Sequence, residues 1–176
     1  MVHPSDSVAQ DVMTWYVNVS VISLWNKSSL TQKSQNWGDT AFTTAAGGWS
    51  FDRGNLGPYS IVWFSALSST GVEYPSGYVT YKNKVLTSVC NNVIARPSGA
   101  NSTYLPLQST RNLSGFYVEW DLGEDGPLTV NVTPNIAVIE AGDIYTRWMG
   151  VMEGGIVGKK EAHSGVIIFE ELRLLV

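Results

Sequence analysis

Apolar and polar residues alternate with a period of two along most of the chain, which is the pattern of half-buried β-strands. Between residues 15 and 25 the odd positions are apolar apart from Ser23, while Asn18 and Ser20 begin the polar set. Shorter runs of the same kind lie at 78–86, 116–120, 128–132 and 144–148. The pattern therefore predicts a chain built almost entirely from strands.

Two other runs are apolar at odd and even positions alike, which indicates strands covered on both faces. They are residues 59–66 and the closing segment 165–174. Glycine-rich turns separate the runs, and Lys82-Asn83-Lys84 interrupts one of them as a hairpin turn. A short helical turn is expected only near residues 4–12. We expect an all-β fold, either an antiparallel barrel or a sandwich.

Composition places these strands in one globular domain. The 176 residues are 44% hydrophobic and 15% charged, enough to bury a core. We expect residues 1–12 to be an N-terminal extension and residues 13–176 a single domain. The net charge of −4 and the scattered basic residues argue against a nucleic-acid partner. The sequence contains no run of eighteen apolar residues, so we expect no membrane span.

The sequence leaves the cellular compartment open between cytoplasmic and secreted. A single cysteine excludes an internal disulfide and favours an intracellular protein, and the first twelve residues contain no signal peptide. Five Asn-x-Ser/Thr sequons favour a secreted protein instead. They begin at Asn18, Asn26, Asn101, Asn112 and Asn131.

Few residues have the spacing of a familiar catalytic or metal site. Two distant histidines and one cysteine do not form a metal-ligand set, and no Gly-x-Ser-x-Gly elbow is present. Glu170 and Glu171 point to opposite sides of the last strand. Either one of them faces inward or lies at a barrel mouth, where it could transfer a proton, or the pair marks the strand end and both carboxylates reach solvent. Arg147, beside Tyr145, either faces solvent or offers a hydrogen-bond fork to a ligand carbonyl.

Aromatic residues are the strongest chemical signal. Seven tryptophans and eight tyrosines in a small β domain suit an apolar wall with polar handles, and they suit a tryptophan-filled core equally well. Residues 36–64 combine aromatic rings, glycines and a Gly57-Pro58 turn, which predicts a strand-turn-strand corner.

The same region resembles a known family. Residues 49–67, WSFDRGNLGPYSIVWFSAL, resemble the W-x-W-G-R-G-x-L-G-P-Y-S-x-V-W-F block of fungal lipocalin-like Diels–Alderases, which are related to the carotenoid hydratase-like proteins with two lipocalin-like halves. Further motifs of that family are similar, in order, to residues 15–17, 36–39, 145–150 and 169–171. The resemblance covers residues 13–174 and corresponds to the second, C-terminal half of the family.

The resemblance implies an antiparallel lipocalin-like β-barrel and a pericyclase-type enzyme of fungal polyketide or terpenoid biosynthesis. Such an enzyme folds a flexible apolar substrate for a [4+2] or hetero-Diels–Alder cycloaddition, in some members with dehydration, and needs no cofactor. The implied shape-giving residues are Trp15, Trp37 and Trp63. The implied donors are Tyr59, Tyr145 and Arg147, and Asp52 or Glu170 would move a proton. Asn36 and Trp49 complete the implied substrate contacts.

Departures from the family motifs leave alternatives open. Ser34-Gln35 stand where the family has histidines, and Asp52 replaces a glycine. The chain is therefore also compatible with a non-catalytic carrier of a hydrophobic small molecule. As a half-domain, it would pair with a missing N-terminal half or with a second copy of itself.

Overall fold

The computed structural model of the chain describes residue 44 and residues 46–82, 84–108 and 112–176. By its internal contacts the chain divides into two units, Met1–Ala46 and Gly47–Val176, and the description below concerns the second. The expected extension at 1–12 and the expected strand at 15–25 lie outside the described residues, so both stay predictions.

The described residues form nine strands and one short 3-10 helix, η1 (Gly123–Asp125). The strands are β1 (Ala46–Leu56), β2 (Tyr59–Ser68), β3 (Glu73–Tyr81), β4 (Lys84–Cys90), β5 (Val93–Pro97), β6 (Phe116–Asp121), β7 (Pro127–Ala141), β8 (Tyr145–Ile156) and β9 (His163–Arg173). The all-β prediction is confirmed, and β7 and β8 are longer than the alternation indicated.

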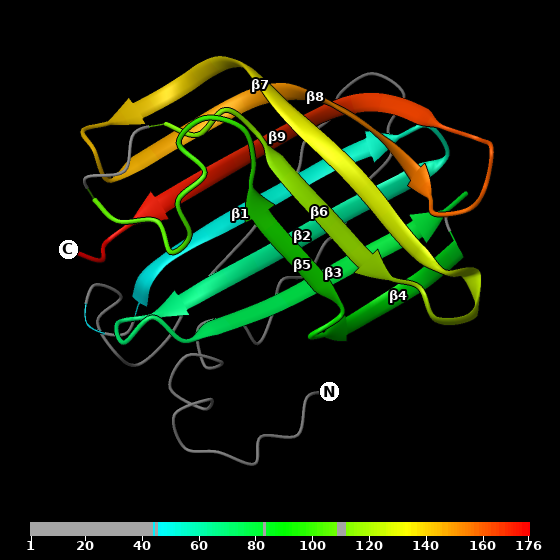
Figure 1. The fold of residues 1–176 in the computed structure, drawn as a ribbon, viewed down its shortest axis with the longest axis horizontal. Helices are drawn as coiled ribbons and strands as arrows, with labels where there is room; N and C mark the ends of the chain where they lie inside the picture. The colour runs from blue at the N-terminus through cyan, green and yellow to red at the C-terminus, as the bar shows by residue number, and fades with distance from the viewer. Residues whose placement is uncertain (1–43, 45, 83, 109–111) are drawn as a thin grey trace. The chain divides into compact units, whose positions relative to one another are not determined.

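The strands make one antiparallel sheet in the order β4-β3-β2-β1-β9-β8-β7-β6-β5 (Figure 1). The β1–β2 turn is the predicted Gly57-Pro58 corner, in which Gly57 takes a φ of +55° that favours glycine. Lys82, with a φ of +47°, lies in the predicted turn between β3 and β4. Strand β9 pairs with β1 on one side and β8 on the other, which brings the end of the chain to the middle of the sheet.

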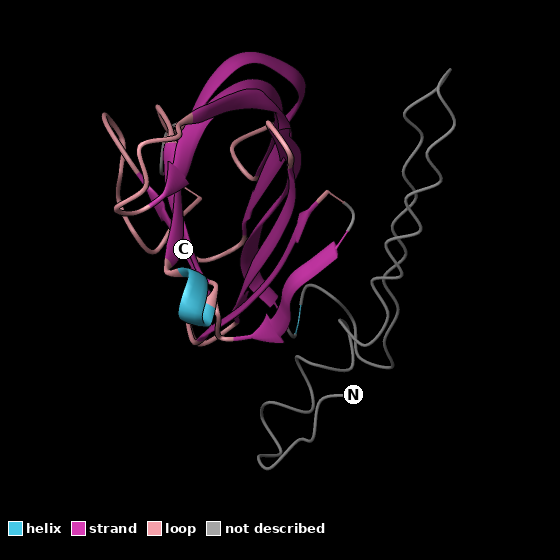
Figure 2. Ribbon diagram, turned by 90° about the vertical axis from the view of Figure 1, so that its right-hand side faces the viewer, coloured by secondary structure: helices cyan, strands magenta, loops and turns pink. Residues whose placement is uncertain are grey.

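The sheet curls round on itself, as Figure 2 shows. Its edge strands β4 and β5 are consecutive and are joined by a tight turn at Asn91 and Asn92. Across the closing side, the indole Nε1 of Trp120 donates to the Val62 carbonyl at 3.3 Å, and its ring packs against Gly77, where any added Cβ would collide with it. The Trp120 side chain therefore joins β6 to β2 and β3 across the curled sheet.

The interior of the curled sheet is filled by aromatic rings. Trp63 packs edge-to-face on Trp120 and Phe116, and Phe116 packs in the same way on Phe169. Trp148 stacks on Phe169 with ring centroids 5.0 Å apart. All five side chains are buried. The sequence left open whether its aromatic rings line a pocket or fill a core, and these five rings fill the core. The expected substrate contact of Trp63 is therefore corrected, because its ring is enclosed.

Asp52 lies inside the same interior rather than in a substrate-facing wall. It pairs with the inward-facing Phe169 and is fully buried. Neither carboxyl oxygen has a hydrogen-bond partner among the described residues. Burial raises the pKa of the Asp52 carboxyl well above its ordinary value, because the interior cannot solvate the ionised form. The interior therefore favours the protonated form of Asp52, which is fully buried.

The last strand was expected to be buried on both faces, but part of its outer face is exposed. Val166 and Ile168 of β9 are 66% and 38% exposed, whereas Ile167 and Phe169 are buried. The prediction was wrong because an apolar residue on the outer side of a sheet is covered only if another layer packs there, and no described segment does so at this position. Val166 and Ile168 therefore form an exposed apolar stretch on the outer side of β9.

Replacing Trp63 tests the filled interior. We expect Trp63→Ala to lower the free energy of unfolding by about 3–5 kcal/mol, because it opens a cavity among packed rings. Urea denaturation measures the loss, and Val166→Ala, on the exposed outer side, should change it by less than about 0.5 kcal/mol. A similar small change for both variants would contradict a filled barrel.

Replacing Asp52 tests its neutral, buried state. The native state binds a proton that the unfolded chain releases above its pKa of about 3.9, so this carboxyl costs stability as the pH rises from that value towards its raised native pKa. We therefore expect the stability gained in Asp52→Asn over the natural chain to increase from pH 4 to pH 7, by at most about 1.4 kcal/mol per pH unit. Denaturation at both pH values measures it, and a pH-independent difference would show that Asp52 is ionised in the fold.

Candidate functional site

Four of the predicted site residues meet on the outer side of the sheet. Glu170 on β9 lies opposite Arg147 on β8 and Phe51 on β1. Two residues along, Leu172 of β9 lies opposite Tyr145 of β8 and Trp49 of β1. Because alternate residues of a strand share a face, this register gathers Trp49, Tyr145 and Arg147 round the Glu170 carboxylate.

The Glu170 carboxylate accepts a hydrogen bond from each of these neighbours. The Tyr145 hydroxyl and the Arg147 Nε donate to its Oε2, each at 2.8 Å, and a second Arg147 nitrogen, Nη2, donates to the same oxygen. The Trp49 indole donates to Oε1 at 3.2 Å. Both oxygens of Glu170 thus already accept hydrogen bonds. The carboxylate therefore orients its three donors and is not free to act as a base.

The charges of the site keep its donors protonated. Burial and the hydrogen bond to Glu170 raise the pKa of Tyr145 to about 12, so its hydroxyl retains its proton at neutral pH. Burial alone would lower the pKa of Arg147, but its hydrogen bonds to Glu170 and the charge of that carboxylate outweigh it and raise the pKa. Arg147 remains a guanidinium, and its side chain is 40% exposed.

Arg53 is a further member of this site that sequence reasoning missed. It lies on the same face of β1 as Trp49 and Phe51, opposite Ile168. Its guanidinium has no hydrogen-bond or ion-pair partner among the described residues. Burial, followed by the positive charge of Arg147, lowers its pKa. The period-two pattern from Trp49 could have revealed it. We call Trp49, Arg53, Tyr145, Arg147 and Glu170 the outer-face cluster.

Apolar side chains surround the outer-face cluster. Phe64 of β2 packs on Phe51 and Trp49, with ring centroids 5.8 and 6.3 Å away. On the other side, Met149 of β8 lies opposite Ile168 and is 49% exposed. Two positive groups and one negative group therefore lie in the middle of an apolar surface. Such an arrangement suits an apolar ligand that carries an electron-rich oxygen.

The other predicted site residues do not join the cluster. Tyr59 faces inward at the opposite end of the barrel, where its ring packs on Tyr81 and His163. Asp52 and Trp63 are enclosed in the interior. Trp15, Asn36 and Trp37 lie outside the described residues, so their substrate contacts stay predictions.

The two adjacent glutamates of β9 face opposite sides of the sheet, as the alternation predicts. However, Glu170, which was expected to transfer a proton, is not the one that faces inward. Glu171, not Glu170, is the inward carboxylate: it is 2% exposed and forms an ion pair with Arg173 at 2.8 Å. Glu170 faces outward with Arg147.

Within the described part of the chain, no group of three or more His, Cys, Asp or Glu side chains could hold a metal ion. Over the same residues, no helix has the length and apolarity needed to cross a membrane.

Two curated fungal proteins match the chain. The quinolone epoxide rearrangement protein penF of Penicillium thymicola is 31% identical over 129 residues, which are 72% of this chain and 35% of that protein. The quinolone epoxide rearrangement protein asqO of Emericella nidulans is 30% identical over 128 residues, again 72% of this chain and 35% of that protein. The chain thus spans about a third of the length of these relatives. No family model matches the chain.

Solved structures show the same fold. The crystal structure of CghA with Sch210972 superimposes with a TM-score of 0.62 at 12% identity, over 82% of this chain and 49% of CghA. Kievitone hydratase from Nectria haematococca gives a TM-score of 0.52 at 13% identity, over 80% of this chain and 43% of that protein. At such identities the likeness concerns the fold, which is lipocalin-like as the motifs predict. The chain is therefore homologous to the fungal quinolone epoxide rearrangement proteins, and it has the lipocalin-like fold that its sequence motifs predict.

Proposed function

We propose that the chain is part of an enzyme of fungal natural-product biosynthesis that rearranges or cyclises an apolar small molecule, and that the outer-face cluster is where it contacts the substrate. One observation carries the proposal: two guanidinium groups, Arg147 and Arg53, lie side by side on an apolar surface, and Glu170 holds the first of them. The homology to rearrangement proteins favours an enzyme over a carrier.

The filled interior argues against the carrier alternative. A lipocalin-type carrier holds its ligand inside the barrel, but here Trp63, Trp120 and Phe169 occupy that space and are buried. Where the described residues do offer apolar surface next to polar donors, they offer it outside the sheet. A ligand on this face would lie against Phe51 and Ile168 and within reach of Arg147.

The chemistry that suits this cluster is stabilisation of an oxygen that gains negative charge. The opening of an epoxide and the polarisation of a carbonyl in a cycloaddition both place such charge on oxygen. The Arg147 side chain is 40% exposed, and Arg53 has no partner among the described residues, so two guanidinium groups are available to a ligand. Tyr145 already donates its one hydroxyl hydrogen to Glu170, so it helps to hold the carboxylate that orients Arg147. Glu170 acts in this proposal as a positioning residue, since both of its oxygens already accept hydrogen bonds.

Two reactions within this class remain candidates, and the relatives favour one. The sequence motifs predict a [4+2] or hetero-Diels–Alder cycloaddition, with dehydration in some members. The relatives at 30–31% identity are named for quinolone epoxide rearrangement, whereas the 12% likeness to CghA concerns only the fold. Epoxide opening is therefore the reaction that we test first, with cycloaddition second.

The exposed outer surface also supports a partner for the chain. Met149, Val151, Val166 and Ile168 are 38–66% exposed on β8 and β9, beside the outer-face cluster. Apolar surface of this kind marks a contact with another layer. Because the curated relatives are about three times as long as their matched part, we assign this contact to the remaining part of a longer protein rather than to a second copy. Such a cover would exclude water and strengthen the electrostatic effect of Arg53 and Arg147.

Removing Arg147 tests the proposed site. In the full-length protein that carries this chain, we expect Arg147→Ala to lower kcat/KM for a quinolone epoxide by about 10²–10³-fold, because the charge on the opening oxygen loses a donor. Since Arg147 is half-exposed, the free energy of unfolding should fall by less than about 1 kcal/mol.

Lys82→Ala is the matched control, because it removes a cation from the exposed turn between β3 and β4, away from the cluster. Its rate should equal that of the natural chain. An unchanged rate and product ratio in Arg147→Ala, for the epoxide and for a diene–dienophile substrate, would remove the cluster from the reaction.

A further inference from the structure

Arg53 differs from the other arginines that the structure describes. Arg96, Arg147 and Arg173 each form an ion pair with a glutamate. Arg53 forms no ion pair or hydrogen bond within the described part of the chain, although its side chain is partly buried. Its burial and the positive charge of Arg147 lower its pKa, and together they outweigh the neighbouring acids. Arg53 is thus a partly buried cation without a counter-charge of its own.

The charges of the outer-face cluster do not balance. Glu170 accepts a hydrogen bond from Arg147 Nε at 2.8 Å, so these two side chains form a neutral pair. Asp52 points to the inner side of the sheet, and burial favours its protonated form. The next acid along the outer side of β8 is Glu153, six residues beyond Arg147. The cluster therefore has one uncompensated positive charge, which lies at Arg53.

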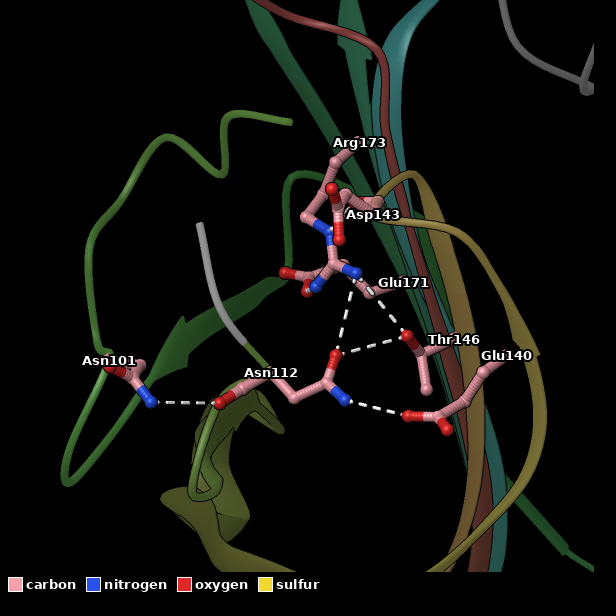
Figure 3. A network of polar contacts seen from close by, with 7 residues as sticks. All are labelled: Asn101, Asn112, Glu140, Asp143, Thr146, Glu171 and Arg173. Carbon is pink, nitrogen blue, oxygen red and sulfur yellow. Dashed lines mark hydrogen bonds and ion pairs between the residues drawn. The ribbon is translucent and has the colours of Figure 1, made fainter. Parts of the chain in front are cut away.

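The inner side of the same sheet contains an arginine whose charge and donors are matched (Figure 3). Arg173 forms an ion pair with Glu171 at 2.8 Å. Its Nε also donates to the Asp143 carbonyl at 3.0 Å, and its Nη2 donates to Thr146 Oγ1 at 3.3 Å. Arg173 thus has one carboxylate and two neutral acceptors, whereas Arg53 has neither kind of partner among the described residues. The imbalance belongs to the outer side.

The surroundings of Arg53 suit a ring with one planar anionic group. Arg53 lies opposite Ile168, which is 38% exposed, and two residues from Phe51 on the same face of β1. The Phe64 ring supports Phe51, with centroids 5.8 Å apart. An apolar ring that rests on Phe51 and Ile168 would bring an attached group to Arg53. The guanidinium fork matches the two oxygens of a carboxylate, and a single negative charge is what the cluster lacks.

A second layer over this face, as proposed above, makes the missing charge more important. Burial of an unpaired guanidinium is strongly unfavourable, whereas a guanidinium with an anionic partner can be buried. A neutral ligand would leave Arg53 unpaired beneath such a layer. An anionic ligand would compensate Arg53, and the same layer would then strengthen their attraction because it excludes water.

Building on the function proposed for the outer-face cluster, we propose that Arg53 determines its substrate specificity by binding a carboxylate-like group that is ionised at neutral pH. The substrate is then an apolar ring system with one negative charge. Arg147, which Glu170 orients, stays available to the oxygen that gains charge in the reaction. The two arginines therefore have separate roles: Arg53 recognises a charge that the substrate already has, and Arg147 stabilises one that develops.

2-Naphthoate and 2-naphthamide test the role of Arg53, because they share a ring system and differ in charge. Isothermal titration of the full-length protein that carries this chain measures both affinities. We expect naphthoate to bind at least about tenfold more tightly, as a hydrogen bond between two charged groups implies. Arg53→Met should abolish this preference by weakening naphthoate alone. Arg53→Lys should retain part of it, because the positive charge remains.

Lys82→Met is the matched control, because it removes one positive charge from the exposed turn between β3 and β4 and should leave both affinities unchanged. A preference for naphthoate that survives Arg53→Met would overturn the role of Arg53. Equal affinities for the two probes, both weakened by Phe51→Ala, would overturn it too and leave the outer-face site in place. Affinities that neither Phe51→Ala nor Arg147→Ala changes would remove the site itself, and the role of Arg53 with it.

Discussion

Strand β9 lies between β1 and β8. Its register with both strands determines which partners each of its polar side chains contacts. Its successive residues point to opposite faces, so Glu170 reaches Arg147 and Tyr145 outside while Glu171 reaches Arg173 inside. A slip of one residue would exchange these environments. It would place the outer ion pair among aromatic rings and expose the inner one, and both polar networks would lose their partners.

The aromatic interior and the outer polar cluster are two consequences of the same sheet. The curled sheet is closed by Trp120 against β2 and β3, and the rings of Trp63, Phe116 and Phe169 occupy the space within. Because that space is full, a ligand the size of a polycyclic natural product finds surface, within the described part of the chain, only on the outer side of the sheet. On the outer side Glu170 holds Arg147 and Tyr145 in place, and fixed groups of this kind are what electrostatic assistance to a reaction requires.

Much of this arrangement follows from the sequence, and the exceptions have physical reasons. The alternation predicted the all-β fold, and the Gly57-Pro58 turn was predicted correctly because its residues determine local geometry. The apolar residues Val166 and Ile168 were expected to be buried, but burial depends on whether a second layer covers that face, which one strand cannot reveal. Tyr145 and Arg147 were identified together because they share a strand face, whereas Arg53 acts with them only through the pairing of β1 with β9. Which of two adjacent glutamates faces inward likewise depends on register and not on composition.

The central claim is that the substrate lies on the outer face of β1, β9 and β8, not inside the barrel. A crystal structure of the full-length protein with an unreactive analogue of a quinolone epoxide measures this directly. We expect the analogue's oxygen within hydrogen-bonding distance of Arg147, with its ring against Phe51 and Ile168. An analogue enclosed within the barrel in the space of the Trp63 ring, or bound away from these three strands, would contradict the claim.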